Sequence, residues 1–566
     1  MLPMRMSSLL LLLLSLAPVF AAPPLAKPRV VLTSLIDDFG FASASFNRDP
    51  ANTPPETVTP HLDGLARDGV VLQRFYMHPF CSPSRASFLS GRLPVHVQQT
   101  NTQPDQPNCG VPYAMSTLPE LLRAADAPVD AYVVGKWDVG SAHERHTPEG
   151  RGFNGSLVYF SHAIDAFTQN DYCGPGAASG GGCACGDRFV DLWDSGAPAA
   201  ALNGTGYADD LFLERALQLI ARHDYASGRT LWLHYCPHAT HDPLQATPAM
   251  LAPLAGTTDD ESLCNASVAA SATGAVYPGG PTAPAAYACR RTYEAMAQYV
   301  DGAFGRLRGA LEAAGVWEDS LVLLSSDNGG QGDLEYGGGS NFPLRGGKGG
   351  FFEGGVRVAA RASGGWVPPA RRGAREPGLA HAADALATVC GLLGVGSACA
   401  SAARAAAAGL PPLDSLDLWP LLSGANATSP RIEVPLGAGA LVTARWKLLL
   451  GRQAVAGWHG PLFPNASSPR ADPHAQVLQC GGAGCLFDVA ADAGEHEDQA
   501  AAQPGVAAAL AARLAALAPG FFSNSDGEAL LECAHNASLS LRGECACDLA
   551  ARGGGFFRGG WARVKG

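Results

Sequence analysis

The stretch RVVLTSLIDDFG, residues 29–40, decides the fold class of this chain. Residues 30–36 form a mostly apolar run rich in β-branched side chains, and two carboxylates and a glycine follow it. A short apolar run bounded by turn residues predicts a buried strand. Asp37 and Asp38 would then lie at the carboxyl end of that strand, where open α/β sheets bind their ligands.

Two further stretches repeat this arrangement. SLVLLSSDNGG, residues 320–330, passes from an apolar run into Asp327 and Asn328, and TLWLHYCPHATHDP, residues 230–243, carries polar residues such as His241 at its end. Both stretches predict strands. The polar residues that follow the three strands would gather at one edge of the sheet.

A helix is predicted between the last two of these strands. Apolar residues recur every three or four positions from residue 293 to residue 311, which indicates an amphipathic helix, and Gly315 ends it. Strands that alternate with helices indicate an α/β fold with a largely parallel sheet. Residues 174–206 and 265–286 are rich in small residues and predict exposed loops.

The composition of the chain changes near residue 430. We expect a large domain over residues 23–430 and a smaller one over residues 431–566. The smaller domain contains the strand-like segment ALVTARWKLLLG and a helical segment near residues 505–517. The stretch SACASAARAAAAGLPP, residues 397–412, fits either a helix or a linker.

Residues 1–22 have the pattern of a secretory signal peptide, with one basic residue near the start, an apolar run and small residues at the end. The run is too short and too near the terminus to span a membrane comfortably, and no other long uncharged apolar segment follows, so we expect no membrane partner. A net charge of −12 argues against nucleic acid as a partner. The extracellular space, a cell wall or periplasmic space, and a lysosome stay open as destinations.

Secretion implies an oxidising environment, in which cysteines are mostly paired. The chain has 15 cysteines, so one is left over when the others form disulfides. Candidate bridges are Cys480 with Cys485, pairs among Cys173, Cys183 and Cys185, and Cys533 with Cys545 or Cys547. Six N-x-S/T sequons also fit a secreted glycoprotein, and they begin at Asn154, Asn203, Asn265, Asn426, Asn465 and Asn536.

The stretch HPFCSPSRASFLSGRLP, residues 78–94, places Cys81 just before a predicted helix. Pro83 suits the first helical position, and the helix should end near Gly91. Backbone N–H groups at a helix N-terminus favour an anion. The residues alone leave open a disulfide and a thiolate nucleophile, although a cysteine-phosphatase loop needs an arginine six positions after its cysteine, where this chain has Ser87.

The string CSPSR, followed by SGR, closely resembles the signature of the type I sulfatases. Their recognition element C-x-P-S-R is present here as Cys81, Pro83, Ser84 and Arg85. In that family a formylglycine-generating enzyme oxidises the cysteine to Cα-formylglycine after translation. The resemblance implies that Cys81 is neither bridged nor free, which would account for the odd number of cysteines.

The resemblance extends along most of the chain. HDPLQ, LPPLDSLDLWPLLSG, RWKLLLG and CLFDVAADAGEHED most resemble the arylsulfatase B group, which includes N-acetylgalactosamine-4-sulfatase and the arylsulfatase I and J relatives. It implies an alkaline-phosphatase-like α/β fold, with a large, mostly parallel sheet flanked by helices and a smaller C-terminal domain that has an antiparallel sheet and a helix. It also implies hydrolysis of sulfate esters, with a sulfated small molecule such as an aryl sulfate, or a sulfated glycan, as substrate.

The chemistry of an aldehyde explains the conversion of the cysteine. A hydrated aldehyde has two hydroxyls on one carbon, of which one attacks sulfur and releases the alcohol. The other hydroxyl then loses a proton, the C–O bond to sulfate breaks and the aldehyde returns. A serine could also attack, but its sulfate ester would have no such internal route of breakdown. The hydrolysis is thereby divided into two easier steps.

The strings DDFG and SSDNGG resemble the two metal motifs of the family. The resemblance implies that Asp37, Asp38, Asp327 and Asn328 are metal ligands, together with residue 81. Oxygen ligands suit a hard cation, Ca²⁺ first and Mg²⁺ second. Zinc is disfavoured, because no histidine accompanies these carboxylates in the sequence. The metal would hold a sulfate oxygen and lower the pKa of the aldehyde hydrate.

Cations must also hold the sulfate and stabilise charge in the transition state. The resemblance assigns this role to Arg85, to Lys136 in VVGKWDVG and to Lys348 in LRGGKGGFFEGGVRV. His241, in HATHDPL, matches a family histidine that contacts the sulfate or protonates the leaving oxygen. His238 is a weaker candidate for this role, and an ordinary structural role is as well supported by the sequence.

One candidate catalytic residue departs from the family pattern. The family motif is usually G-K-W-H-L-G, and its histidine touches the aldehyde hydrate and takes the proton when sulfate is released. This chain has Asp138 at that place, whose carboxylate could accept a proton but would repel a bound sulfate. A changed pH dependence, slow turnover and loss of activity stay open, and His143 or His146 is a candidate to compensate.

Three hypotheses follow. The first, which we favour, is an active secreted sulfatase, and the second is a catalytically impaired sulfatase-like protein that binds sulfated glycans. The third is a phosphatase or phosphodiesterase of the wider alkaline-phosphatase superfamily. Such enzymes use serine or threonine nucleophiles and histidine-rich zinc sites, and they carry S-D-H-G where this chain has S-D-N-G at residues 326–329, which argues against the third hypothesis.

Overall fold

The computed structural model describes residues 27–49, 57–101, 110–141, 144–171, 190–254, 289–332, 337–400, 409–411, 413–460 and 476–522. Within these ranges, every helix is too short or too polar to cross a lipid bilayer. Several predictions fall outside them: the signal peptide, the loop 265–286, His143, the bridges proposed for Cys173, Cys183, Cys185, Cys533, Cys545 and Cys547, and the sequons at Asn265, Asn465 and Asn536.

The described residues form one large mixed sheet and one small sheet. The large sheet has ten strands in the order β10-β2-β9-β8-β1-β7-β3-β4-β5-β6. Its strands are β1 (Val30–Ile36), β2 (Val70–Tyr76), β3 (Val129–Lys136), β4 (Gly155–Tyr159), β5 (Trp193–Asp194), β6 (Ala197–Pro198), β7 (Thr230–Cys236), β8 (Ser320–Ser326), β9 (Arg357–Ser363) and β10 (Ala374–His381).

Most pairings in the large sheet are parallel, as predicted. The pairs β8–β1, β1–β7, β7–β3, β3–β4 and β10–β2 are parallel, whereas β9 and β5 run antiparallel to their neighbours. The three strands that the sequence predicted are β1, β7 and β8. They lie side by side in the middle of the sheet, so the residues that follow them share one edge.

Strand β1 shows why the sheet is covered on both faces. Val31 and Leu35 pack into one hydrophobic cluster, whereas Val30, Leu32 and Ile36 pack into another. Successive side chains of a strand point to opposite faces, so an unbroken apolar run requires cover on each side. Helices α2, α4 and α10 contribute to the first cluster, and α1, α5 and α8 contribute to the second.

The helix predicted from residue 293 is confirmed as the C-terminal part of α8 (Cys289–Ala313), and Gly315 follows with a φ of 67°. That left-handed conformation favours glycine. The other α-helices are α1 (Pro60–Arg67), α2 (Cys81–Ser90), α3 (Pro94–Val97), α4 (Leu118–Ala124), α5 (Ala208–Arg222), α6 (Pro248–Leu251), α9 (Glu353–Val356), α10 (Asp384–Leu392), α11 (Gly396–Ala400), α13 (Trp419–Ser423) and α14 (Pro504–Leu517).

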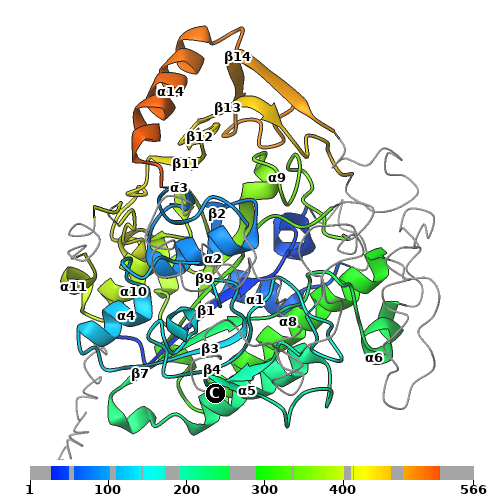
Figure 1. The fold of residues 1–566 in the computed structure, drawn as a ribbon, viewed down its shortest axis with the longest axis vertical. Helices are drawn as coiled ribbons and strands as arrows, with labels where there is room; N and C mark the ends of the chain where they lie inside the picture. The colour runs from blue at the N-terminus through cyan, green and yellow to red at the C-terminus, as the bar shows by residue number, and fades with distance from the viewer. Residues whose placement is uncertain are drawn as a thin grey trace, which may run out of the picture.

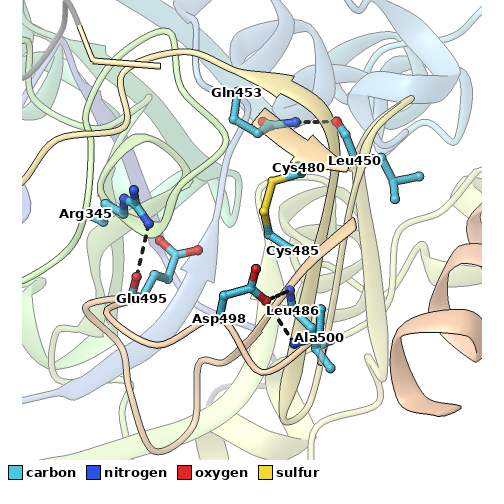
Figure 2. Close-up of a disulfide and its surroundings, with 9 residues drawn as sticks. All are labelled: Arg345, Leu450, Gln453, Cys480, Cys485, Leu486, Glu495, Asp498 and Ala500. Carbon is cyan, nitrogen blue, oxygen red and sulfur yellow. Dashed lines mark hydrogen bonds between the residues drawn. A yellow bond between two sulfur atoms is a disulfide. The ribbon is translucent and has the colours of Figure 1, made fainter. Parts of the chain in front are cut away.

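The small sheet is antiparallel and belongs to the C-terminal part of the chain, as predicted. Its strands are β11 (Glu433–Gly437), β12 (Ala440–Thr443), β13 (Trp446–Gln453) and β14 (Leu478–Asp488). Figure 1 shows this sheet and α14, in yellow and orange, at the top of the view above the large sheet. The predicted bridge between Cys480 and Cys485 is present within β14 (Figure 2).

Three local predictions need correction. The segment 440–451 is two strands rather than one, because the chain turns after Thr443, whose Oγ1 accepts from the N–H of Trp446. Part of 174–206 is not an exposed loop, because β5 and β6 extend the large sheet and Trp193 is buried. The stretch 397–412, for which a helix and a linker were both open, needs no correction, because its described residues include the end of α11.

The third correction concerns the helix after the CSPSR string. Helix α2 begins at Cys81 itself, and Pro83 is its third residue rather than its first. The first four N–H groups of a helix have no partner within the helix, so a proline is tolerated anywhere in the first turn. The predicted end is confirmed, because Gly91 follows the helix with a φ of 66°.

Candidate active site

The carboxyl ends of four neighbouring parallel strands meet at one edge of the large sheet. Asp37 and Asp38 follow β1, Asp327 follows β8, Lys136 ends β3, and His241 lies in the loop after β7. All five side chains are buried. The structure therefore brings together the polar strand ends that the sequence placed at a single edge.

Cys81 is held at this edge by a closed turn before α2. The Oγ of Ser84 accepts a hydrogen bond from the N–H of His78 at 3.0 Å and donates to the carbonyl of His78 at 3.1 Å. The thiol of Cys81 is 1% exposed, and its Sγ lies 3.6 Å from Oδ1 of Asp37. Cys81 makes no disulfide, so the bridged interpretation is wrong.

A second cysteine is unpaired, whereas the odd number of cysteines in the sequence suggested one. Cys236 is also buried and unbridged, so Cys81 is not the single unpaired cysteine of the chain. Burial raises the pKa of the Cys236 thiol to about 11. Burial also raises the pKa of the Cys81 thiol, with a partial offset from Lys136. Neither residue is a low-pKa thiolate of the kind that catalytic cysteines require.

Four side chains at this edge could hold a metal ion. The ligand atoms of Asp37, Asp38, Cys81 and His241 all lie within 4.8 Å of one another. The sequence argument against zinc assumed that no histidine accompanies the carboxylates, and this premise is wrong. His241 is remote in sequence, but the loop after β7 brings its Nε2 to 3.6 Å from Oδ2 of Asp38.

Asp327 and Asn328 complete the carboxylate cluster. Oδ1 of Asp327 accepts from the N–H of Asp38 at 3.3 Å, and Nδ2 of Asn328 donates to Oδ1 of Asp38 at 2.6 Å. Oδ1 of Asn328 is buried without a hydrogen-bond partner. A buried carbonyl oxygen without a partner is costly unless something binds it. This oxygen belongs to a side chain that contacts the carboxylate of Asp38, and it therefore fits a hard cation.

Three cations surround the cluster. Lys136 donates to Oδ2 of Asp37 at 2.8 Å, and Lys348 donates to Oδ2 of Asp38 at 2.7 Å. Arg85 donates through Nε and one terminal nitrogen to Oδ2 of Asp327, at 3.0 and 2.7 Å. The predicted cationic residues thus each contact a different carboxylate of the cluster.

These contacts set the protonation of the buried groups. Burial would raise the pKa of Asp37, but the charges of His241 and Lys136 hold the pKa well below its ordinary value. Burial would lower the pKa of Lys136, but Asp37 raises it overall. For Asp327, burial and the charge of Asp37 raise the pKa to about 7. Asp37 is therefore a carboxylate near neutral pH, and Lys136 is an ammonium ion.

The loop after β7 carries both predicted histidines, but it uses them differently. Nδ1 of His241 lies 2.6 Å from the carbonyl and 3.0 Å from Oδ1 of Asp242, and its Nε2 lies 2.9 Å from Nζ of Lys348. His238 is fully buried, and burial lowers its pKa to about 3. His241 is in contact with the cluster, whereas His238 packs edge-on against Tyr159.

Asp138 lies next to Lys136 and to the first turn of α2. Its Oδ1 accepts from Oγ of Ser82 at 2.7 Å, and Nδ1 of His162 lies 2.9 Å from the same oxygen. Oδ2 of Asp138 lies 3.6 Å from Nζ of Lys136. Of the two histidines expected to compensate, His146 stacks on Tyr113 instead.

His162 was not among the predicted site residues. The signal that would have found it is its place directly after the apolar segment that forms β4, where a polar residue reaches the same edge of the sheet. The segment around His162 carries no motif. Its proximity to Asp138 can therefore be recognised only once β3 and β4 are known to pair.

Most of the large-sheet part of the chain matches a known protein family. The family model described as Sulfatase matches residues 29–395. The chain belongs to the sulfatase family. The matched segment begins just before β1 and ends after α10, so it contains every site residue named above.

Curated relatives of this sulfatase are themselves named sulfatases. Mouse arylsulfatase J is 29% identical over 516 residues, which cover 86% of this chain and 75% of the relative. Bovine arylsulfatase A is 30% identical over 445 residues, which cover 75% of this chain and 73% of the relative. Arylsulfatase J belongs to the subgroup that the sequence resembled.

A solved structure agrees in fold. Ps i-CgsB, solved in complex with k-i-k-neocarrahexaose, has a TM-score of 0.65 and 23% identity, and the match covers 88% of this chain and 94% of that chain. At this identity the likeness concerns the fold alone. It bears out the predicted alkaline-phosphatase-like architecture with its separate antiparallel sheet.

The family membership decides between the broad hypotheses. The sulfatase is a sulfuric ester hydrolase, as its named relatives are. The phosphatase hypothesis is therefore not retained. Both curated relatives are named as arylsulfatases, so they lend no support to the hypothesis of a binding protein without turnover.

Proposed function

We propose that this sulfatase hydrolyses aryl sulfates or sulfated glycans with a formylglycine nucleophile made from Cys81 and a divalent cation held beside it. The observation that carries the proposal is the position of Cys81. It is unbridged, and it is the first residue of the buried helix α2. Its side chain contacts a carboxylate cluster that three cations surround.

The cation would be held by Asp37, Asp38, Asp327, Asn328 and an oxygen of residue 81. The unsatisfied Oδ1 of Asn328 supports this ligand set. Five oxygen-donating residues favour Ca²⁺, with Mg²⁺ second. When bound, the cation supplies Lewis-acid stabilisation of negative charge on oxygen.

The charges of the site favour an anionic group. The three carboxylates of the cluster are balanced by three protein cations, namely Arg85, Lys136 and Lys348. A bound divalent cation would then leave the cluster with a net positive charge, which attracts a sulfate ester. Lys136 and Lys348 flank residue 81 and would orient the sulfate, and His241 would contact it or protonate the leaving oxygen.

The burial of Cys81 has a consequence for its modification. A side chain that is 1% exposed is not reachable by an enzyme in the folded protein. A formylglycine-generating enzyme would therefore act on the chain before α2 packs onto the sheet. The predicted signal peptide would direct the chain to the secretory route, where such an encounter before folding is expected.

Mass spectrometry combined with a turnover assay tests the proposal. We expect the peptide that contains residue 81 to carry an aldehyde instead of a thiol, and the purified protein to hydrolyse a chromogenic aryl sulfate. Replacing Cys81 by alanine should reduce turnover on the order of a thousandfold or more, because it removes the nucleophile. Full conversion without turnover at any pH would favour a sulfated-glycan binding protein instead.

Cys236 provides the matched control. It is buried and unbridged like Cys81, and burial raises its pKa in the same direction. The variant Cys236→Ala should keep both the aldehyde at residue 81 and the turnover. If residue 81 remains a thiol in a protein that still turns over aryl sulfate, the nucleophile has been assigned wrongly.

A further inference from the structure

A carboxylate lies where this site should bind an anion. Asp138 is fully buried, and it lies beside Lys136 and the first turn of the helix that begins at Cys81. A buried negative charge at this place would repel a sulfate ester strongly at short range unless another group offsets it. Anion binding here therefore needs a group that balances Asp138.

His162 is in direct contact with this carboxylate. Its Nδ1 lies 2.9 Å from Oδ1 of Asp138, and its side chain is 17% exposed. Lys136 is the nearest other cation, but it lies farther away at 3.6 Å and already donates to Asp37 at 2.8 Å. His162 is thus the nearer partner of Asp138, and Lys136 is shared.

The position of His162 is fixed by the fold. Strand β4 pairs with β3, which carries Lys136 at its end, so the residues after the two strands are neighbours. Oδ2 of the buried Asp191 accepts from the N–H groups of Phe160 and Ser161 at 2.9 and 2.7 Å. These two bonds hold the backbone immediately before His162 and so aim its ring at Asp138.

The electrostatics of the pair agree with this contact. Burial would raise the pKa of Asp138, but the charges of His162 and Lys136 hold the pKa below its ordinary value. Asp138 is therefore an ionised carboxylate near neutral pH. Nδ1 of His162 and Oγ of Ser82 both contact Oδ1 of this carboxylate, so His162 is the basic side chain placed to offset its charge when an anion binds nearby.

We propose that His162 is a positioning residue of this site, which neutralises and orients Asp138 so that a sulfate ester can bind beside a carboxylate. The inference rests on the proposed function, because it concerns the sulfate site at residue 81. The pair of Asp138 and His162 would thereby occupy the place that a single histidine has in the family motif. Ser82 supports the pair by donating to the same carboxylate oxygen.

The affinity for inorganic sulfate tests the proposal without requiring turnover. Calorimetry on the calcium-loaded, full-length protein should show sulfate binding weakened about tenfold in His162→Ala, because the charge of Asp138 is no longer offset. Asp138→Asn should bind at least as tightly as the wild type. The double variant should regain the wild-type affinity, and KM for an aryl sulfate should follow the same order.

Rescue by the second substitution separates this role from a merely structural one. If the double variant binds sulfate as weakly as His162→Ala, or if His162→Ala binds like the wild type, the proposal is wrong. His162→Gln, which keeps a donor but cannot carry a charge, serves as a second variant and should also lose affinity. Thermal unfolding confirms that each variant is folded.

His96 is the matched control for loss of a His–Asp pair. Its Nδ1 lies 2.8 Å from Oδ2 of Asp414, and its side chain is also 17% exposed. His96→Ala should leave sulfate affinity unchanged. A wild-type protein that neither binds sulfate nor turns over would overturn the proposed function together with this inference, whereas turnover with no change across the variants would overturn this inference alone.

Discussion

Asn328 and Asn341 are both fully buried asparagines near the carboxylate cluster, but their side-chain oxygens differ. Oδ1 of Asn341 accepts from the N–H groups of Gly330 and Phe41, at 2.9 and 3.3 Å. Oδ1 of Asn328 has no partner. The first oxygen is used by the protein itself, whereas the second is available to an ion.

This difference predicts the effect of metal removal. Chelation should lower the unfolding temperature of the wild type, because an ion at a hundred times its dissociation constant stabilises the folded state by about 2.7 kcal/mol. Asn328→Ala should show a smaller difference between loaded and chelated protein, as measured by thermal unfolding. Elemental analysis identifies the ion, and a stoichiometric zinc content would contradict the assignment of Ca²⁺ or Mg²⁺.

Asn341→Ala is the control for this experiment. It should lower stability by a similar amount with and without the ion, because its lost hydrogen bonds lie within the protein. If both variants lose the same response to the ion, Asn328 has no special role in binding it.

At the residue scale, the sequence could predict the groups that follow buried strands. Asp37 and Asp327 end apolar runs, so their place at a shared edge follows from the pattern of strands alone. His162 and Cys236 could not be assigned in this way. The role of His162 depends on its contact with Asp138, and the unbridged state of Cys236 depends on which cysteines its strand brings near.

At the element scale, helix α5 holds the histidine loop. Asp209, in its first turn, is fully buried and accepts from the N–H groups of His238 and Ala239 at 2.8 and 3.1 Å. The loop then continues to His241 at the carboxylate cluster. An N-terminal acidic residue of a helix thereby fixes the backbone of an active-site loop.

Replacing Asp209 by alanine should therefore affect both stability and catalysis. Loss of the two hydrogen bonds should cost about 1.5–3 kcal/mol in the free energy of unfolding, measured with urea. The value of kcat should fall, because His241 is no longer held in place. Asp210→Ala should have a much smaller effect on kcat, since Asp210 accepts from Tyr299 on the exposed side. Equal kcat values for the two variants would show that Asp209 does not position the loop.

Elements with a strong local signal were predictable, and elements defined by packing were not. Helix α8 has an apolar repeat and a terminal glycine, and α14 has a long alanine-rich run, so both follow from the sequence. Strands β5 and β6 have two residues each, and only their pairing with β4 and with each other makes them strands. The first residue of α2 was likewise set by the turn between His78 and Ser84.

At the scale of the whole molecule, the small sheet shares part of its hydrophobic core with the rest of the chain. Residues of its strands share one hydrophobic cluster with residues from β2, α3 and α9 of the large-sheet part, including Tyr76, Val95 and Val356. The composition predicts a division near residue 430, but it does not predict this shared core. The described part of the chain therefore joins the two sheets through a common interior.

An ionic cluster lies in the same interface. Nζ of Lys447, on β13, lies 3.0 Å from Oε1 of Glu353 and 3.0 Å from Oε1 of Glu495, and all three residues are fully buried. Tyr76 donates to Glu353 at 2.9 Å, and the guanidinium of Arg345 donates to the carbonyl of Glu495 at 3.2 Å (Figure 2). Two buried carboxyl groups thus share one lysine between the sheets.

This cluster predicts a pH dependence of stability. Burial and the charge of Glu353 raise the pKa of Glu495 to about 7, from an ordinary value of 4.5. Between these values the folded state binds a proton that the unfolded state has lost, so the free energy of unfolding should fall as the pH rises from about 5 to about 7. Glu495→Gln, which imitates the protonated acid, should reduce this slope by up to about 1.4 kcal/mol per pH unit in urea unfolding.

Two comparisons make this prediction specific to Glu495. Asp209, whose pKa burial also raises to about 7, contributes a slope of the same sign, so the variant should keep part of the pH dependence. Glu433→Gln, at the exposed pair with Arg513, should leave the slope of the wild type unchanged. A Glu495→Gln protein with the full wild-type slope would show that Glu495 is ionised in the interface throughout this pH range, beside Lys447 and an ionised Glu353.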